Sequence, residues 1–461
     1  MSEPLSRLWA ATVERAPRAI AVVEAATGRK WTRFALSRAA AEWAACLPRR
    51  AGKPAFARRR IAMSAANGVE WFQVFLGLLS VGAVPVPIDP SEPEAAQAAT
   101  ALRVGAACLW RGGRFQPVGA AAGRPRPSSE CLVKLTSGSS GVPKALAFTH
   151  GQMEADGRQI CHSMRIGPGD SSLAAIPLGY SYGLGNLVVP LLAQGSPVLC
   201  VSSTFPQAVA AEAARLRPTV FPAVPPLLRA LVGSDVPSRA FASVRLVISA
   251  GSALPPELAG AFAEKFGRRV HGFYGTSETG GIAFDPTGDA TLEGRSVGIP
   301  MHRVQIAIGR AGRLTVSGPA VFGRGLFSPA DRAELNPRGE LVLLGRTGRM
   351  VKVAGRRLDL AEIEGALRAL PGIRDALAHL GADAVLGAAV ATELSSGEIR
   401  RLLRPRLASW KVPSRILTFS ELPANQRGKT DARLLRQLLA APRMAASIST
   451  LSSERQMSAP R

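Results

Sequence analysis

The stretch LTSGSSGVPKALAFTH, residues 135–150, joins a loop rich in glycine and serine to a single lysine. Apolar runs flank this loop, CLVKLT at 131–136 and KALAFT at 144–149, and they predict two β-strands. The loop SGSSGVP lies between them and carries donors that an anionic ligand could use. The loop is therefore the first candidate for a ligand site in this chain.

The composition of the loop suits the oxygens of a polyphosphate. Gly138 and Gly141 allow backbone conformations that point successive N–H groups toward one centre. The remaining donors are hydroxyl groups and one ammonium group, from Thr136, Ser137, Ser139, Ser140 and Lys144. The loop is not a Walker loop, because no Ser or Thr follows its lysine to open a helix. A flexible surface turn is the alternative that composition alone leaves open.

The composition of the whole chain indicates two or three domains, since 461 residues exceed one ordinary core. The formal net charge of +24 comes mainly from arginines scattered along the chain. Nucleic-acid binding is one interpretation of this charge, and an acidic partner or anionic ligand is the other. We favour the second and expect no nucleic-acid partner, because we find no basic helix and no basic-aromatic stripe.

Cysteine and histidine usage indicates a reducing compartment. The five cysteines form no C-x-x-C pair, so we expect buried free thiols, and the five histidines do not cluster as zinc ligands do. The N-terminus lacks the pattern of a signal peptide, so we expect a cytoplasmic protein. FQVFLGLLSVGAVPVPI, residues 72–88, is broken by two prolines and predicts a helix followed by a buried strand, not a membrane span.

The order of the apolar runs predicts an α/β fold in which helices pack on mixed sheets up to about residue 340. Short strands after residue 302, such as RVQIAIG, RLTVSG and ELVLLG, predict a small β subdomain. A compact α+β pattern follows GRTGRM. We therefore expect a large domain at 1–344, a linker at 345–350, a small α+β domain at 351–440 and a disordered tail at 441–461.

The loop motif SGSSGVPK resembles the Ser/Thr/Gly-rich motif of the adenylate-forming enzymes. This superfamily includes acyl- and aryl-CoA synthetases, luciferases and the adenylation domains of peptide synthetases. The resemblance extends from about residue 5 to 440, because further motifs follow in the family's order. They are NGVEWFQVFLGLLSVGAVPVPID (67–89), SAGSALPPEL (249–258), YGTSETG (274–280), GRTGRMVKVAGRRLDLAEIE (345–364), WKVP (410–413) and LPANQRGKTD (422–431).

The resemblance implies an ATP-dependent enzyme that converts a carboxylic acid to acyl-AMP, releases pyrophosphate and passes the acyl group to a thiol. The implied cofactors are ATP, Mg²⁺ and coenzyme A, or the phosphopantetheine of an acyl carrier protein. The domain at 1–344 would bind ATP and the acid. The domain at 351–440 would be a mobile lid that rotates about 345–350, where Gly348 replaces the family's acidic or lysine hinge residue.

The resemblance also assigns the nucleotide site. The residues expected to contact ATP are Thr136, Ser137, Gly138, Ser139, Ser140, Gly141, Lys144, Gly251, Ser252, Ala253, Tyr274, Gly275, Thr276, Asp331 and Arg346. Among these, Tyr274 would cover the adenine, and Asp331 and Arg346 would bind the ribose. Glu278 would hold Mg²⁺, with Thr136 as a weaker ligand. The residues with catalytic roles would be Lys144, Ser277, Glu278 and Lys429.

The acyl pocket and the thiol tunnel are assigned in the same way. The acyl pocket would be lined by Tyr180, Tyr182, Gly183, Leu184, Phe273, Gly280 and Gly281, and the thiol tunnel by Gly355 and Arg357. Many relatives have histidine where Tyr180 stands. We see no acid placed to pair with a substrate amine, so we expect a fatty or aryl acid. The glycines are expected to leave room for a long or flat substrate.

Two alternatives remain beside a CoA ligase. One is an acyl-AMP ligase that loads only an acyl carrier protein. The other is a non-catalytic protein that binds nucleotide or ligand on the same fold. The presence of Lys144, Glu278 and Lys429 at the family's charged positions favours an enzyme over the non-catalytic alternative.

Overall fold

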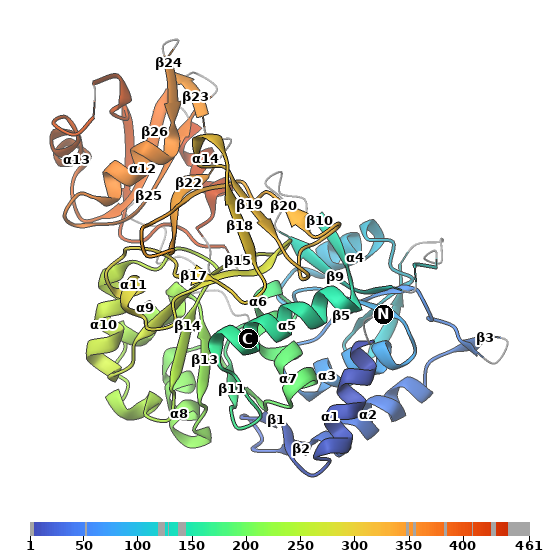
Figure 1. Cartoon of the computed structure of the whole chain (residues 1–461). Coiled ribbons are helices and arrows are strands. Elements are labelled where there is room, and N and C mark those ends of the chain that lie inside the picture. The colour runs from blue at the N-terminus through green and yellow to red at the C-terminus, as the bar shows by residue number, and fades with distance from the viewer. Residues whose placement is uncertain are drawn as a thin grey trace, which may run out of the picture. The chain divides into compact units, whose positions relative to one another are not determined.

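The structure, a computed structural model, describes residues 4–50, 53–118, 125–127, 129–136, 144–346, 350–353, 356–381, 385–407, 409–425 and 430–440. The chain divides into two compact units, Met1–Gly345 and Arg346–Arg461. Figure 1 labels the elements of both units. The predicted α/β class is confirmed, with a large first unit of helices and several sheets and a small α+β second unit.

A nine-stranded sheet forms the centre of the first unit. In spatial order its strands are β17 (Ile299–Pro300), β16 (Gly280–Phe284), β15 (Val270–Thr276), β14 (Leu246–Ser249), β13 (Val220–Ala223), β11 (Ser172–Ala174), β12 (Val198–Cys200), β1 (Ile20–Glu24) and β2 (Lys30–Thr32). The strands from β15 to β1 run parallel, whereas β16, β17 and β2 are antiparallel to their neighbours. Parallel strands need crossover connections, which the intervening helices provide.

Helices cover both faces of this sheet, which explains why its strands are apolar at nearly every position. Val22 and Val23 are adjacent in β1, yet they belong to two different core clusters because successive side chains point to opposite faces. The helices of the first cluster are α1 (Leu5–Arg15), α2 (Arg33–Ala45), α3 (Val69–Ser80), α5 (His150–Met164) and α7 (Val189–Gln194). Those of the second cluster are α8 (Pro206–Leu216), α9 (Pro225–Gly233) and α10 (Pro256–Phe266).

Smaller sheets complete the first unit. They are formed by β6 (Val84–Pro87), β5 (Arg60–Ser64), β7 (Cys108–Arg111) and β8 (Arg114–Pro117); by β9 (Glu130–Thr136) and β10 (Lys144–Thr149); by β3 (Arg49–Arg50) and β4 (Lys53–Pro54); by β18 (Gln305–Ile308), β19 (Leu314–Ser317) and β20 (Leu326–Phe327); and by β21 (Asp331–Leu335) and β22 (Leu341–Arg346). The predicted β strands after residue 302 are confirmed as β18, β19 and β22.

Short helices link these strands. They are α4 (Glu94–Arg103), α6 (Ser181–Gly183), a π-helical turn (Leu184–Val188), α11 (Asp289–Leu292) and 3₁₀ turns at Ser238–Phe241 and Arg310–Gly312. The helix-then-strand prediction for residues 72–88 is confirmed by α3 and β6. Among the helices that the structure describes, none is long and apolar enough to cross a membrane.

The second unit has its own core. Its strands are β23 (Met350–Val353) with β24 (Arg356–Asp359), and β25 (Ile373–Leu380), β26 (Leu386–Thr392) and β27 (Arg415–Phe419). Its helices are α12 (Leu360–Arg368), α13 (Ser396–Leu403), α14 (Ala432–Ala440) and a 3₁₀ turn at Ser409–Lys411. Apolar side chains such as Ile363, Val390 and Ile399 pack between them. The tail expected to be disordered, 441–461, lies outside the described residues.

Four of the five cysteines are buried free thiols, as predicted. Burial raises the pKa of Cys108, Cys161 and Cys200 to about 12, which keeps these thiols protonated and unreactive. Cys46 is exposed, so the prediction of a buried thiol is wrong at that position. It follows the last residue of α2, where the helix ends at the surface.

Candidate active site

The first part of the site is the strand pair that carries the phosphate-loop candidates. β9 and β10 are antiparallel with Thr136 opposite Lys144, which confirms the two predicted strands. This register places a hydroxyl and an ammonium group at the two ends of the loop at 137–143. That loop holds the predicted donors of 137–141 and lies outside the described residues. The Lys144 side chain is exposed, so it is accessible to an anionic ligand.

The second part is the turn between β15 and β16, where Thr276 lies opposite Gly280. The Thr276 N–H donates to Oγ1 of Thr279 over 3.2 Å, and the Thr279 N–H donates back to Oγ1 of Thr276 over 3.3 Å. Thr279 is fully buried beneath the turn. These bonds fix the backbone of the turn and leave Ser277 and Glu278 at its tip.

The tip of this turn has the chemistry of a metal and phosphate site. The Glu278 backbone carbonyl accepts a hydrogen bond from the Phe322 N–H over 2.7 Å, and the Ser277 hydroxyl accepts one from Ser181 over 3.0 Å. The Glu278 carboxylate is half-buried, and no cation within the described ranges pairs with it. A carboxylate that is partly desolvated and unpaired suits a hard divalent ion whose other ligands are phosphate oxygens and water.

Two residues assigned to ATP from distant parts of the sequence meet in the structure. The Tyr274 hydroxyl donates to Oδ2 of Asp331 over 2.9 Å, across 57 positions of sequence. Tyr274 lies on β15, two residues before the Thr276 that begins the turn, and Asp331 begins β21. Gly275, between Tyr274 and Thr276, is exposed. A Cβ at this position would lie 2.4 Å from the Gly280 carbonyl oxygen, so only glycine fits.

Three further residues assigned to ATP follow the neighbouring strand. Gly251, Ser252 and Ala253 are exposed directly after β14, and Gly251 has a φ of +92°, which favours glycine. β14 is parallel to β15, so the carboxyl ends of both strands reach the same edge of the sheet. Ligands of open α/β sheets bind at such an edge.

The acyl-pocket candidates form an aromatic wall beside this edge. The Tyr182 hydroxyl donates to the Ile248 carbonyl over 3.1 Å, and its ring lies 5.8 Å from the ring of Phe273. Burial raises the pKa of Tyr182, so its phenol is a fixed donor. Gly183 and Leu184 are buried behind Tyr182, and Leu184 belongs to the main core.

Tyr180 borders a separate cavity of about 260 Å³. Its hydroxyl donates to a carboxylate oxygen of Asp89, and both residues line this cavity together with Trp71 and Asn67. Asp89 was missed as a site residue, although it ends the quoted segment at 67–89. No sequence pattern pairs it with a tyrosine 91 positions away.

The expectation that Gly280 and Gly281 leave room for a long or flat substrate is wrong in the structure. A Cβ at Gly280 would lie 2.2 Å from Oδ1 of Asp156, and one at Gly281 would lie 2.5 Å from the Met301 sulfur and 2.8 Å from the Phe273 ring. The space beside both glycines is therefore filled by other side chains. Close packing, not an open chamber, accounts for glycine at these positions.

Asp156, whose carboxylate occupies the space beside Gly280, forms a buried ion pair that was also missed. Nζ of Lys134 lies 3.5 Å from Oδ2 of Asp156, and the two side chains are 1% and 3% exposed. Lys134 also lies over the Phe148 ring, 4.3 Å from its centroid. Oδ1 of Asp156 accepts the Gly281 N–H over 3.2 Å. A lysine inside the apolar run CLVKLT was the only signal, and it pointed to burial without indicating a partner.

The remaining assigned residues belong to the second unit or its boundary. Arg346 ends β22 and Arg357 lies in β24, and only their backbones are described. Gly355 and Lys429 lie outside the described residues, as does Gly348. Their roles are those that the family resemblance implies.

Comparisons with known proteins agree on one family. Residues 111–324 match the family model of AMP-binding enzymes. A feruloyl-CoA synthase of an Amycolatopsis species is 26% identical, over 65% of this chain and 68% of that protein. The probable non-canonical nonribosomal peptide synthetase CymA of Salinispora arenicola is 26% identical over 94% of this chain, which spans 6% of that protein's length.

A solved structure shows the same fold. ATP-bound MatB from Rhodopseudomonas palustris superposes with a TM-score of 0.81 at 20% identity, covering 95% of this chain and 99% of MatB. The predicted architecture of a large first domain and a small second domain agrees with this match.

Proposed function

We propose that this chain, which belongs to the adenylate-forming superfamily, activates a carboxylic acid with ATP and then transfers the acyl group to a thiol. In the first step a carboxylate oxygen bonds to the α-phosphorus of ATP, and the bond from that phosphorus to pyrophosphate breaks. In the second step a thiolate sulfur bonds to the acyl carbon, and AMP leaves. Both steps need alignment and charge neutralisation more than covalent help from the protein.

The hydrogen bond between Tyr274 and Asp331 is the observation that carries this proposal. A nucleoside needs an aromatic face for its base and a carboxylate for its ribose hydroxyls. The Tyr274 ring and the Asp331 carboxylate would meet these two needs, and the contact between the two side chains supports this assignment. The same strand continues into the turn that presents Ser277 and Glu278, so the α-phosphate would follow the nucleoside along one continuous segment.

The phosphate end of the site would use charge from two elements. Lys144 would bind the β- and γ-phosphates with the Thr136 hydroxyl opposite it. Glu278 and Thr136 would hold Mg²⁺, which when bound neutralises phosphate charge. Lys429 would bridge the substrate carboxylate and the α-phosphate, because a cation there screens the repulsion between two anions.

The aromatic acyl wall supports an aryl acid over a long fatty acid, with the substrate ring against Tyr182 and Phe273 and not beside Gly280 and Gly281. Tyr182 and Phe273 present aromatic rings 5.8 Å apart, and the space beside Gly280 and Gly281 is filled. A flat ring stacks well against aromatic side chains. The similarity to a feruloyl-CoA synthase supports the same class of substrate.

Coenzyme A is the proposed thiol, and the net charge of +24 suits an anionic acceptor. The phosphopantetheine arm of a carrier protein is the second candidate, because the chain is also similar to a peptide synthetase. The two acceptors differ in one observable property, which is turnover with free coenzyme A.

Pyrophosphate release from ATP and Mg²⁺ tests the proposal. Benzoic, cinnamic and fatty acids are supplied one at a time, with and without coenzyme A. We expect acid-dependent release that becomes catalytic with coenzyme A. Release that stays stoichiometric would indicate a carrier protein as acceptor, and the second candidate would then replace the first.

Matched lysine variants show whether the release comes from this site. Lys429→Ala should lose acid-dependent release, and Lys144→Ala should reduce it about tenfold to a hundredfold. Lys30→Ala should retain it, because Lys30 is an exposed lysine on β2 outside the candidate site. Equal activity of all three variants would contradict the assignment.

A further inference from the structure

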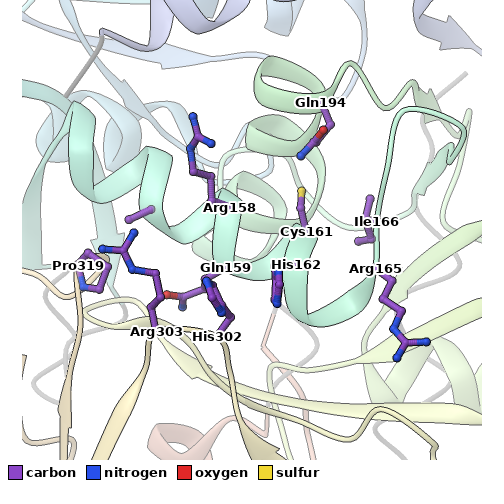
Figure 2. A pocket seen from close by; sticks show the side chains of 11 residues that line it. Arg158, Gln159, Cys161, His162, Arg165, Ile166, Gln194, His302, Arg303 and Pro319 are labelled. Atoms are coloured by element: carbon purple, nitrogen blue, oxygen red, sulfur yellow. The ribbon is translucent and has the colours of Figure 1, made fainter.

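A second pocket, of about 500 Å³, lies along α5 and contains none of the residues assigned to the active site. Its lining includes Arg158, His162 and Arg165 from α5 and the residue after it, together with His302 and Arg303 from the segment that follows β17. Figure 2 shows these side chains on α5 with the residue after it and on the segment after β17. No step of the proposed reaction uses this pocket.

The side chains that line the pocket carry positive charge, and most of this charge is not neutralised by nearby carboxylates within the described ranges. Among the residues that the structure describes, no aspartate or glutamate lines it. Arg158 pairs with Glu154 over 2.7 Å, but Arg165 and Arg303 have no carboxylate within ion-pair distance in the described part of the chain. The imidazoles of His162 and His302 lie tilted at 33° to each other with their ring centres 4.0 Å apart. Guanidinium and imidazole N–H groups gathered in one hollow bind anions.

Gln159 supplies an independent sign of a ligand. It lines the pocket, yet its side chain is 1% exposed. Its Nε2 donates to the Gly281 carbonyl over 2.7 Å, which fixes the orientation of the amide. Its Oε1 is buried and accepts no hydrogen bond from the residues that the structure describes. A buried acceptor without a donor is costly, so a donor from a ligand would remove that cost.

We propose that this pocket binds a small anion of phosphate chemistry that also carries a hydroxyl group. The anionic oxygens accept N–H bonds from Arg303 and the neighbouring cations. The hydroxyl donates to Oε1 of Gln159. Inorganic phosphate is the smallest ligand with both features, since its protonated oxygen is a donor, and a phosphate ester of a polyol is the other source.

Calorimetric titration at pH 7 and constant ionic strength tests the proposal with three probes. Inorganic phosphate and glycerol 3-phosphate carry a hydroxyl donor, whereas sulfate carries none at this pH. We expect one of the first two to bind about tenfold or more tightly than sulfate, as one charge-assisted or buried hydrogen bond would give. The tighter of the two identifies the source. Equal binding of all three probes, or no binding, would overturn the proposal.

Variants separate this pocket from the phosphate loop of the nucleotide site. Arg303→Ala should weaken phosphate binding about tenfold or more, because it removes an exposed cation that no carboxylate of the described residues pairs with. Arg239→Ala is the matched control, an exposed arginine on the 3₁₀ turn Ser238–Phe241, and it should bind as the wild type does. Loss of binding in Lys144→Ala but not in Arg303→Ala would place the anion at the nucleotide loop and refute the proposal.

Gln159→Met tests the hydroxyl requirement. This variant should reduce phosphate binding to the level of sulfate while leaving sulfate binding unchanged. A retained preference for phosphate would show that Gln159 does not recognise the hydroxyl. Because Gln159 is buried, folding of the Gln159→Met variant is checked by comparing its far-ultraviolet circular dichroism with that of the wild type. If this variant does not fold, the Arg303→Ala result decides whether the anion binds in this pocket. These binding measurements do not depend on adenylation activity.

Discussion

The ion pair between Lys134 and Asp156 should be one of the most sensitive points in the first unit. Its members are 1% and 3% exposed, so water cannot take the place of a lost partner. Lys134→Met would leave the Asp156 carboxylate with the Gly281 N–H as its remaining hydrogen bond. Removing one member of such a pair costs about 3–5 kcal/mol of unfolding free energy. We expect a loss in that range for Lys134→Met and also for Asp156→Asn.

The double variant Lys134→Met/Asp156→Asn should be less destabilised than the sum of the two single variants. It removes both charges, retains an acceptor near Gly281 and fills the lysine volume with an apolar chain. Replacing both members of a buried pair is often close to neutral, so the coupling free energy should be several kcal/mol.

Urea unfolding followed by tryptophan fluorescence measures these free energies. Trp9, Trp31, Trp43, Trp71 and Trp110 lie in the first unit and a sixth tryptophan in the second, so the signal reports mainly on the first unit. Single losses below about 1 kcal/mol that add in the double variant would refute the reasoning. They would show that the pair is solvated.

An exposed pair provides the control for this cycle. Arg38 and Glu42 form an i, i+4 ion pair on α2 whose side chains are both 67% exposed. Arg38→Met should cost about 0–0.5 kcal/mol, because solvated pairs contribute little. A similar cost at the exposed and buried pairs would remove burial as the explanation.

Three further outcomes are expected. Tyr274→Phe removes the hydrogen bond to Asp331, so steady-state kinetics should show KM for ATP raised about threefold to tenfold with kcat nearly unchanged; an unchanged KM would contradict the nucleoside assignment. Lys144→Ala should lower kcat/KM for ATP about tenfold to a hundredfold, the value of a charge-assisted contact, and full activity would show that the lysine does not touch the phosphates. Hydrogen bonds from Arg295 lower the pKa of Glu340 from 4.5 to about 2, so this pair stabilises the fold above pH 4.5 and the contribution disappears as the pH falls toward 2. Thermal midpoints between pH 5 and 2 should therefore fall more steeply in the wild type than in Glu340→Gln, and parallel curves would contradict the shift.

Local pattern accounts for the parts of the fold that the sequence predicted. The strands on either side of the phosphate loop and the helix and strand at 72–88 follow from periodicity and from glycine and proline positions. These signals lie within a few residues of each other. These local signals can therefore be read from a single sequence, even when the segments that pack against each element are unknown.

Side-chain contacts between distant segments could not be predicted in this way. Tyr180 with Asp89 joins residues 91 positions apart. Gly280 and Gly281 are ambiguous for the same reason, since glycine fits both an open chamber and a close contact. The position of Asp156, on a helix more than 100 residues earlier, decides between the two.

The site residues form an intermediate case. The family resemblance assigned both Tyr274 and Asp331 to the nucleoside of ATP. The structure adds that the two side chains are hydrogen-bonded to each other. Cys46 shows the opposite outcome. It was expected to be buried with the other cysteines, but the end of α2 lies at the surface.

Isotope exchange between pyrophosphate and ATP, measured with Mg²⁺ and one carboxylic acid but without any thiol, tests the central claim most directly. Reversible formation of acyl-AMP predicts exchange that requires the acid, is strongest with an aryl acid and is lost in Lys429→Ala and Glu278→Ala. Binding of ATP without exchange, across aryl and fatty acids alike, would contradict the claim that this chain adenylates a carboxylic acid.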